Sequence, residues 1–185
     1  MKNKTLHNLI VVCCVINLLF AVSGILVAVY DKQPFVAIFV TMFMFAYHAD
    51  VRVVIGAVTN KLVKSRINVD KKCYTVSKKE FDFLSKLDVK KWKDKFVTLF
   101  SDQFTVSTNN IENVLKNNIN AEITHHLCFA MGLLAIPLGW LISAEELWLY
   151  VATAVVASLA LDLPPILIQR YNRFRLLKIK NRKSL

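Results

Sequence analysis

The sequence predicts an all-α membrane protein with four transmembrane helices, and two observations support this fold class. The 185-residue chain is 55% hydrophobic with a mean hydropathy of +0.44, whereas a soluble domain carries about 45–50% apolar residues. Its apolar residues are also gathered into runs of about 20, the length that crosses a bilayer, and charged stretches separate these runs. We therefore expect one polytopic membrane domain, residues 1–185.

Each span is predicted from one apolar run. The first run follows Lys2 and Lys4 as in a signal peptide, but the apolar region of a signal peptide is shorter, about 7–15 residues, so we expect this run to be retained as a span. The second begins at Pro34, and the fourth is interrupted late by Pro164 and Pro165. The expected spans are TM1 at residues 9–30, TM2 at 34–58, TM3 at 121–142 and TM4 at 147–169.

Residues 61–120 contain no run able to cross a bilayer and are predicted to form a basic cytoplasmic loop. Ser77 and Glu80 have the spacing of a capping box, which starts a helix. Further along, apolar residues at helical spacing alternate with lysines at positions 90, 91, 93 and 95; they are Trp92, Phe96, Leu99 and Phe100. This pattern predicts a basic amphipathic helix lying in the membrane interface.

The distribution of positive charge predicts the orientation. Of the 24 Lys and Arg residues, 13 lie in the central loop and seven in the tail at 170–185, and the net charge is +11. Because cytoplasmic segments of membrane proteins are enriched in Lys and Arg, we expect both termini and the central loop in the cytosol, next to anionic membrane lipids. No nucleic-acid motif accompanies the charge, so nucleic acid is not an expected partner.

Ionisable residues recur in the cytoplasmic halves of three predicted spans. An ionisable group at the centre of a bilayer costs at least about 2.5–3.5 kcal/mol on insertion scales, so each such residue needs a reason. They are His48, Asp50 and Arg52 in TM2, Glu122, His125 and His126 in TM3, and Asp162 in TM4, where the polar but uncharged Gln169 approaches the same leaflet. We expect the bundle to bring them to one depth, in a site open to the cytosol.

Glu122 and His125 are the candidate catalytic residues. They are three positions apart on one helix, so the carboxylate can reach the imidazole on the same face. A carboxylate that accepts the proton of one ring nitrogen fixes the tautomer and makes the other nitrogen a better base. Such a pair can deprotonate a hydroxyl nucleophile.

Structural roles and a metal site remain open for the same residues. His48 can be a core histidine, Arg52 can extend to lipid headgroups, and Asp162 can pair with an arginine. Glu122 and His125 also have the Glu-x-x-His spacing of di-iron bundles, which need two such motifs, and the chain has one. We therefore assign no metal, and a zinc site formed by His48, His125 and Glu122 stays an alternative.

Three segments of the C-terminal half resemble a known family in sequence and in order. They are residues 90–95 (KKWKDK), 121–125 (AEITH) and 163–176 (LPPILIQRYNRFRL). Together they resemble the glycosyl-4,4'-diaponeurosporenoate acyltransferase family of staphyloxanthin-type carotenoid biosynthesis, over roughly residues 89–176. The run QRYNR is the most specific part. The chain has His126 and Phe174 where the family usually has Trp and Pro.

The resemblance implies an O-acyltransferase in a bacterial-type cell membrane. It would move a fatty acyl group from a cytosolic thioester such as acyl-CoA, with no other cofactor, to a hydroxyl of a glycosylated lipid or similar amphiphile. His125, oriented by Glu122, would be the general base. The residues implied in substrate binding are Trp92 and Lys93 at the interface, and Gln169, Arg170, Asn172 and Arg173 for the phosphates of the donor. His48, Arg52 and Asp162 are added as substrate-binding candidates because they are polar residues within the predicted spans.

Other functions fit parts of the same pattern. The arginines of the tail are also what ordinary positive-inside anchoring requires. A non-catalytic membrane scaffold or a transporter-like protein would need no acyl donor, and a metal-dependent membrane enzyme would use the histidines as ligands. The sequence sets no oligomeric state.

Overall fold

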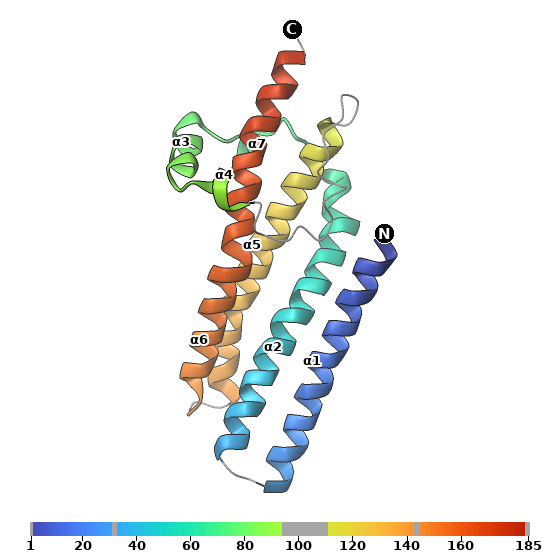
Figure 1. Cartoon of the computed structure of the whole chain (residues 1–185), viewed down its shortest axis with the longest axis vertical. Coiled ribbons are helices and arrows are strands. Elements are labelled where there is room, and N and C mark those ends of the chain that lie inside the picture. The colour runs from blue at the N-terminus through green and yellow to red at the C-terminus, as the bar shows by residue number, and fades with distance from the viewer. Residues whose placement is uncertain (1, 31–32, 94–110, 143–144, 184–185) are drawn as a thin grey trace. The chain divides into compact units, whose positions relative to one another are not determined.

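The computed structural model describes residues 2–30, 33–93, 111–142 and 145–183 (Figure 1). Helices form nearly all of these residues and no strand occurs among them, which confirms the predicted all-α class. The main helices are α1 (Lys2–Tyr30), α2 (Gln33–Val58), α5 (Ile111–Ile142), α6 (Leu147–Ala157) and α7 (Leu163–Lys183). The short ones are α3 (Lys78–Lys86), α4 (Val89–Trp92), the 3₁₀ turns η2 (Lys64–Arg66) and η3 (Lys72–Tyr74), and the π-helical turns η1 (Thr59–Val63) and η6 (Ser158–Asp162).

The described residues contain four stretches that are long and apolar enough to cross a membrane. These are Ile10–Tyr30, Phe35–Arg66, Ile111–Leu141 and Leu147–Arg182. Many of their large apolar side chains point away from the protein, among them Leu18, Leu141 and Trp148. Apolar residues on the outside of apolar helices are typical of surfaces that face lipid. The chain is therefore a multi-pass membrane protein, as predicted.

Three helices extend beyond the predicted spans. α1 begins at Lys2, before the predicted start of its span at residue 9. α5 begins at Ile111, inside the segment predicted as loop, because its first turns bury Val114, Leu115 and Ile119 along one stripe. α7 continues through Lys183, so the predicted tail at 170–185 is helical as far as the structure describes it. Pro164 lies in the first turn of α7, where a proline is compatible with a helix, so it starts the helix rather than ending it.

The central segment is helical only in part. The capping box is formed as predicted, since Ser77 Oγ accepts a hydrogen bond of 3.2 Å from the Glu80 amide at the start of α3. Trp92 ends the short helix α4. The remaining residues of the predicted amphipathic helix, Phe96, Leu99 and Phe100, fall in 94–110 and lie outside the described residues. That helix stays a prediction.

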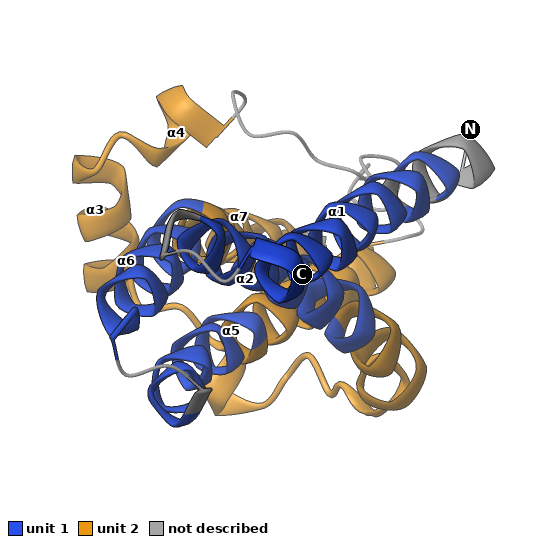
Figure 2. Ribbon diagram, turned by 90° about the horizontal axis from the view of Figure 1, so that it is seen from below, with its two compact units in different colours: residues 1–55, 128–160 blue, residues 56–127, 161–185 orange. Residues whose placement is uncertain are grey.

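The chain divides into two compact units, and α2 and α5 each contribute to both (Figure 2). Unit 1 comprises Met1–Ile55 and Cys128–Ala160, and unit 2 comprises Gly56–Leu127 and Leu161–Leu185. The division into units does not test whether residues 1–185 form one membrane domain, which stays a prediction.

The core of unit 1 is aliphatic and aromatic. Its buried residues come from α2, α5 and α6; they are Val40, Met44, Ala135, Tyr150 and Ala154. Phe20 of α1 lies against α2, with its ring centroid 5.2 Å from that of Phe39 and 5.7 Å from that of Phe43. Gly139 permits the close approach of α6, because a Cβ built there would lie 2.2 Å from Tyr150 Cγ.

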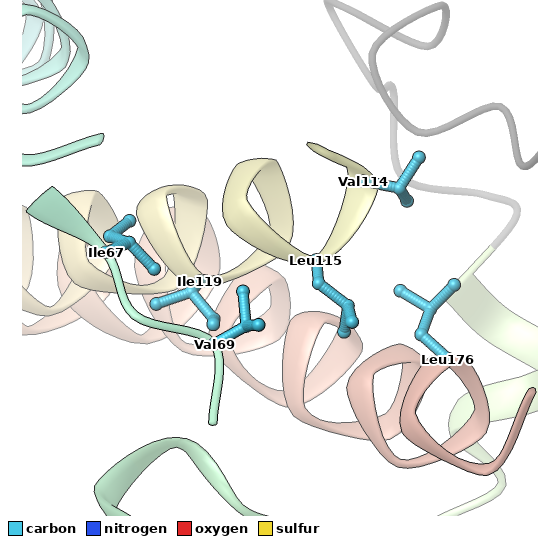
Figure 3. Close-up of a cluster of buried hydrophobic side chains, with 6 residues drawn as sticks. All are labelled: Ile67, Val69, Val114, Leu115, Ile119 and Leu176. Carbon is cyan, nitrogen blue, oxygen red and sulfur yellow. The ribbon is translucent and has the colours of Figure 1, made fainter. Parts of the chain in front are cut away.

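Unit 2 has two small cores on either side of α7. The first joins Val114, Leu115 and Ile119 of α5 to Leu176 of α7. It is closed by Ile67 and Val69, which follow η2 and lie beside Ile119 in Figure 3. The second joins the hairpin of α3 and α4 to α7 through Leu84, Val89 and Tyr171. These two cores hold α5, α3 and α7 together around the polar residues described next.

Candidate functional site

Polar side chains of α5 and α7 bind one another in a row within unit 2. His125 Nδ1 of α5 lies 3.2 Å from the Oδ1 atom of Asp162, the last residue of η6 before α7 begins. Further along, Asn118 Nδ2 donates to Gln169 Oε1 at 2.5 Å. Partners that come later in α7 contact residues that come earlier in α5, so the two helices run antiparallel and share a polar stripe.

Arg173 is the most buried arginine in this stripe, with 1% of its side chain exposed. Its Nη2 donates to Glu122 Oε2, its Nε donates to Asn118 Oδ1 at 3.0 Å, and its Nη1 donates to the carbonyl of Tyr74 at 3.3 Å. All three guanidinium nitrogens are therefore used inside the protein. A buried charge is tolerated only when it is paired and hydrogen-bonded in this way.

Arg170 lies one turn earlier on α7 and joins two carboxylates. Its Nε and Nη2 donate to the two carboxylate oxygens of Glu80, the second at 2.9 Å, and its Nη1 donates to Glu122 Oε1 at 3.0 Å. This hydrogen-bonded Arg170 guanidinium is the main cause that holds the pKa of Glu80 below its ordinary value. Glu122 therefore bridges two arginines, and Glu80 brings α3 to the same cluster.

Aromatic packing explains how α3 reaches α7 (Figure 1). The Phe81 ring stacks on Phe174 with centroids 4.2 Å apart and on Tyr171 with centroids 5.1 Å apart. Trp92 packs at the edge of this core, and its Nε1 donates to the carbonyl of Leu87 at 2.9 Å. The hairpin is thus fixed by apolar contacts, and the Glu80 carboxylate is directed at Arg170.

The carboxylate beside His125 differs from the one that the sequence predicted. Glu122 was expected to orient His125, but both of its carboxylate oxygens accept from arginines, and the partner of His125 is Asp162. Hydrogen bonds between two charged groups are stronger than those to a neutral imidazole, which explains why Glu122 binds the guanidinium groups. The neighbouring His126 has its Nδ1 2.9 Å from the backbone carbonyl of Glu122.

The His125–Asp162 pair combines burial with access. No part of the Asp162 side chain is exposed, whereas 28% of the His125 side chain is. Asp162 ends a π-helical turn, a feature found frequently at functional sites because it redirects side chains. The arrangement leaves one imidazole edge held by a buried carboxylate, as a general base requires.

Two predicted substrate-binding residues lie in unit 1. His48 is buried, and its Cε1 would lie 3.2 Å from a Cβ built on Gly132. Arg52 Nη1 donates to the His48 carbonyl at 2.7 Å, so these two residues share a helix face as their spacing predicts. The other predicted site residues belong to unit 2; they are Trp92, Lys93, Glu122, His125, Asp162, Gln169, Arg170, Asn172 and Arg173.

Sequence reasoning missed two members of the arginine cluster, Glu80 and Asn118. Glu80 was noted only as part of a capping box, and its contact with Arg170 spans 90 residues of sequence. Asn118 precedes Glu122 by one helical turn, and that spacing was the available signal. Among the described residues, no group of three or more His, Cys, Asp and Glu side chains is arranged to hold a metal ion.

Fold and site together define a class of protein. It is a multi-pass helical membrane protein with a buried arginine–carboxylate cluster and a histidine–aspartate pair. The family model for glycosyl-4,4'-diaponeurosporenoate acyltransferase matches residues 70–182, which is more than half of the chain. The chain belongs to this acyltransferase family, and the resemblance noted in the sequence is confirmed. No curated protein and no solved structure matches the chain. The matched segment includes Glu80, Glu122, His125, Asp162 and both arginines, but not His48 or Arg52.

Proposed function

We propose that this protein is a membrane O-acyltransferase. It transfers a fatty acyl group from a cytosolic thioester to a hydroxyl of a glycosylated lipid or similar amphiphile, and His125 is its general base. The observation that supports this reaction best is the 3.2 Å contact of His125 Nδ1 with the buried Asp162 carboxylate, inside the segment that matches an acyltransferase family.

The pair suits this chemistry for a simple reason. With its proton on Nδ1, the imidazole donates to Asp162 and offers Nε2 as the acceptor of the proton of the substrate hydroxyl. The hydroxyl oxygen then forms a bond to the thioester carbonyl carbon, and the carbon–sulfur bond breaks. The imidazolium, stabilised by the Asp162 carboxylate, returns the proton to the leaving thiolate, so that ester and free thiol are produced.

The arginines have different roles in this proposal. Because Arg173 and Gln169 are buried and bonded to Asn118, these two residues position α7 rather than bind substrate. Arg170 keeps 25% of its side chain exposed and uses three of its five N–H groups for Glu80 and Glu122, so the other two can donate to phosphates of the donor. Lys93, Trp92 and Asn172 are partly exposed near the same helices and are the further candidates for donor contacts.

The membrane orientation predicted from the sequence is consistent with a donor that arrives from the cytosol. The N-terminal lysines, the basic central segment and the basic end of α7 belong on the cytoplasmic side by the positive-inside rule. His125 lies in the cytoplasmic half of the span Ile111–Leu141 in that orientation. A thioester that cannot cross the bilayer would reach it from the cytosol.

The two adjacent histidines provide a matched test. We expect the His125→Ala protein, purified in lipid nanodiscs, to lose about 10²–10⁴-fold of its acyl-transfer rate, the typical contribution of a general base. The His126→Ala protein should retain most of the activity, because the Nδ1 atom of His126 contacts a backbone carbonyl of its own helix, that of Glu122, at 2.9 Å. Full activity in a folded His125→Ala protein would refute the proposal.

A further inference from the structure

Unit 1 contains a cavity of about 350 Å³, and all of its lining residues except Met131 precede the family-matched segment 70–182. It is formed by α1, α2 and the part of α5 that belongs to unit 1. Its wall is mainly apolar, with a few polar groups; the lining residues are Asn17, Phe20, Phe43, Ala46, Tyr47, Asp50, Val51, Val54, Ile55 and Met131. An apolar cavity with few, well-placed polar groups is typical of a small-molecule site.

The polar groups of the cavity lie within the membrane-spanning part of the helices. At about 1.5 Å per residue, Asn17 is about 10 Å along α1 from the start of the span at Ile10. Its Nδ2 donates to Asp50 Oδ1 at 3.1 Å and Oδ2 at 3.3 Å, and also to the carbonyl of Cys13 at 3.0 Å. The Asp50 carboxylate, which bonds to Asn17, is exposed at a similar depth. Such a group is costly in a membrane, so its presence there points to a function.

All the polar atoms that the cavity offers to a ligand are acceptors. The amide hydrogens of Asn17 are used within the protein, and the Tyr47 hydroxyl donates to the carbonyl of Met131 at 2.7 Å. A carboxylate can accept about four hydrogen bonds, so Asp50 has capacity left beyond Asn17. The cavity therefore favours a ligand that donates, and it disfavours an anionic headgroup, which the Asp50 carboxylate would repel.

We propose that this cavity binds the acceptor amphiphile, with its apolar chain against Phe20, Phe43 and Val54 and a hydroxyl on Asp50. A glycosylated lipid has both parts, whereas a fatty acid or an acyl thioester brings negative charge to the carboxylate. That the bound amphiphile is the acyl acceptor rests on the proposed acyl transfer. The binding itself needs no donor and no reaction, so the two proposals can fail separately.

The test is photo-crosslinking of the full chain in lipid nanodiscs with an alkyl glucoside that carries a diazirine in its alkyl chain. We expect labelled peptides from α1, α2 and the 128–142 part of α5. Excess unlabelled alkyl glucoside should compete, and a fatty acid of the same chain length should compete about tenfold less well or worse, because its carboxylate is repelled by Asp50.

Two neighbouring valines supply the matched variants. Val54 lines the cavity and is 59% exposed, so Val54→Trp should fill the cavity without unfolding the protein and should reduce labelling by about tenfold or more. Val53, on the same helix, is 37% exposed and does not line the cavity, so Val53→Trp should leave labelling unchanged. Asp50→Asn should weaken glucoside binding by about tenfold to a hundredfold, the worth of one hydrogen bond to a charged group.

Three results would overturn this binding site: equal labelling of the Val54→Trp and Val53→Trp proteins, labelling confined to other helices, or competition that ignores the headgroup. The last result would mean that the cavity holds any lipid chain. Specific labelling with no acyl transfer from the same preparation would leave the cavity assignment standing and count against the proposed function. Acyl transfer that is unaffected by Val54→Trp would count against the cavity as the acceptor site and leave the proposed function standing.

Discussion

At the scale of single residues, Glu122 decides the electrostatics of unit 2. Its side chain is 8% exposed and accepts from Arg170 on one oxygen and from Arg173 on the other. Removing one member of such a buried cluster leaves another charge buried without a partner. The resulting loss of stability is larger than the net stabilisation that the intact cluster provides. Glu122 is therefore the buried counterion of the α7 arginines, while Asp162 is the carboxylate in contact with His125.

The first prediction follows from this role. Glu122→Gln should lower the free energy of unfolding by about 3–5 kcal/mol, because it leaves the buried Arg173 without its carboxylate. The measurement is an unfolding titration in mixed micelles. Glu112→Gln on the same helix is the control; Glu112 is 61% exposed and pairs with Lys116, so its loss should cost at most about 0.5 kcal/mol. Equal stability of the two variants would contradict the assignment.

At the scale of the elements, the hairpin of α3 and α4 is attached to α7 by a stack of rings and by the Glu80–Arg170 pair. The second prediction concerns the pH dependence of this attachment. The pKa of Glu80 is lowered from its ordinary value of 4.5, chiefly by its hydrogen bond to Arg170. The stabilisation is therefore complete above 4.5 and is lost as the pH falls through the lowered value in the folded protein.

Hydrogen exchange of the amides in 78–92 checks this prediction. Protection of the hairpin should decrease as the pH falls below 4.5, after correction for the intrinsic exchange rates. In the Glu80→Gln protein, protection should already be low at neutral pH and should change less with acid. A parent hairpin whose protection does not change with pH would show that the rings alone hold it.

The third prediction concerns the packing of α6 on α5 in unit 1. A Cβ at Gly139 would lie 2.2 Å from Tyr150 Cγ, and Tyr150 is fully buried, so the ring has little room to move. Gly139→Ala should therefore destabilise the protein by about 1–3 kcal/mol. Gly56→Ala, with no atom within 4 Å of the added methyl group, should be neutral or should stabilise by up to about 1 kcal/mol. Melting temperatures of both variants distinguish packing from helix propensity, and equal values would contradict this explanation.

At the scale of the whole molecule, the fourth prediction is the orientation. With both termini in the cytosol, a single cysteine at Lys183 should be protected from a membrane-impermeant maleimide in intact cells, in a background without the native cysteines. A cysteine at Lys32, between the first two spans in the sequence, should be labelled. Labelling of position 183 in intact cells would reverse the topology and remove the argument for a cytosolic donor.

Much of the fold could be predicted from the sequence because lipid imposes a simple requirement. A span needs about 20 apolar residues, and the four runs of the chain meet it. The ends of the helices were harder to predict, since α5 and α7 continue where hydropathy falls. Their continuations are stabilised by contacts between Leu115 and Leu176 and by Arg173, which belong to distant segments. Hydropathy along the chain contains no information about such contacts.

The sequence predicted which residues belong to the candidate site better than it predicted which of them contact one another. Local spacing paired Glu122 with His125, because a helical period reports only neighbours on the same helix. The actual partner of His125 lies 37 residues away, at Asp162. Asp162 had been selected for its cost in the membrane, so the energetic argument found it although the spacing argument could not.

The measurement that tests the central claim most directly is a double-mutant cycle on the His125–Asp162 pair. Acyl-transfer rates are compared for the parent, His125→Ala, Asp162→Asn and the double variant, all checked for folding in nanodiscs. If the two residues act as one unit, the double variant is no slower than His125→Ala alone, since Asp162 has nothing left to orient. Independent losses that multiply in the double variant, or a His125→Ala protein as fast as the parent, would contradict the claim.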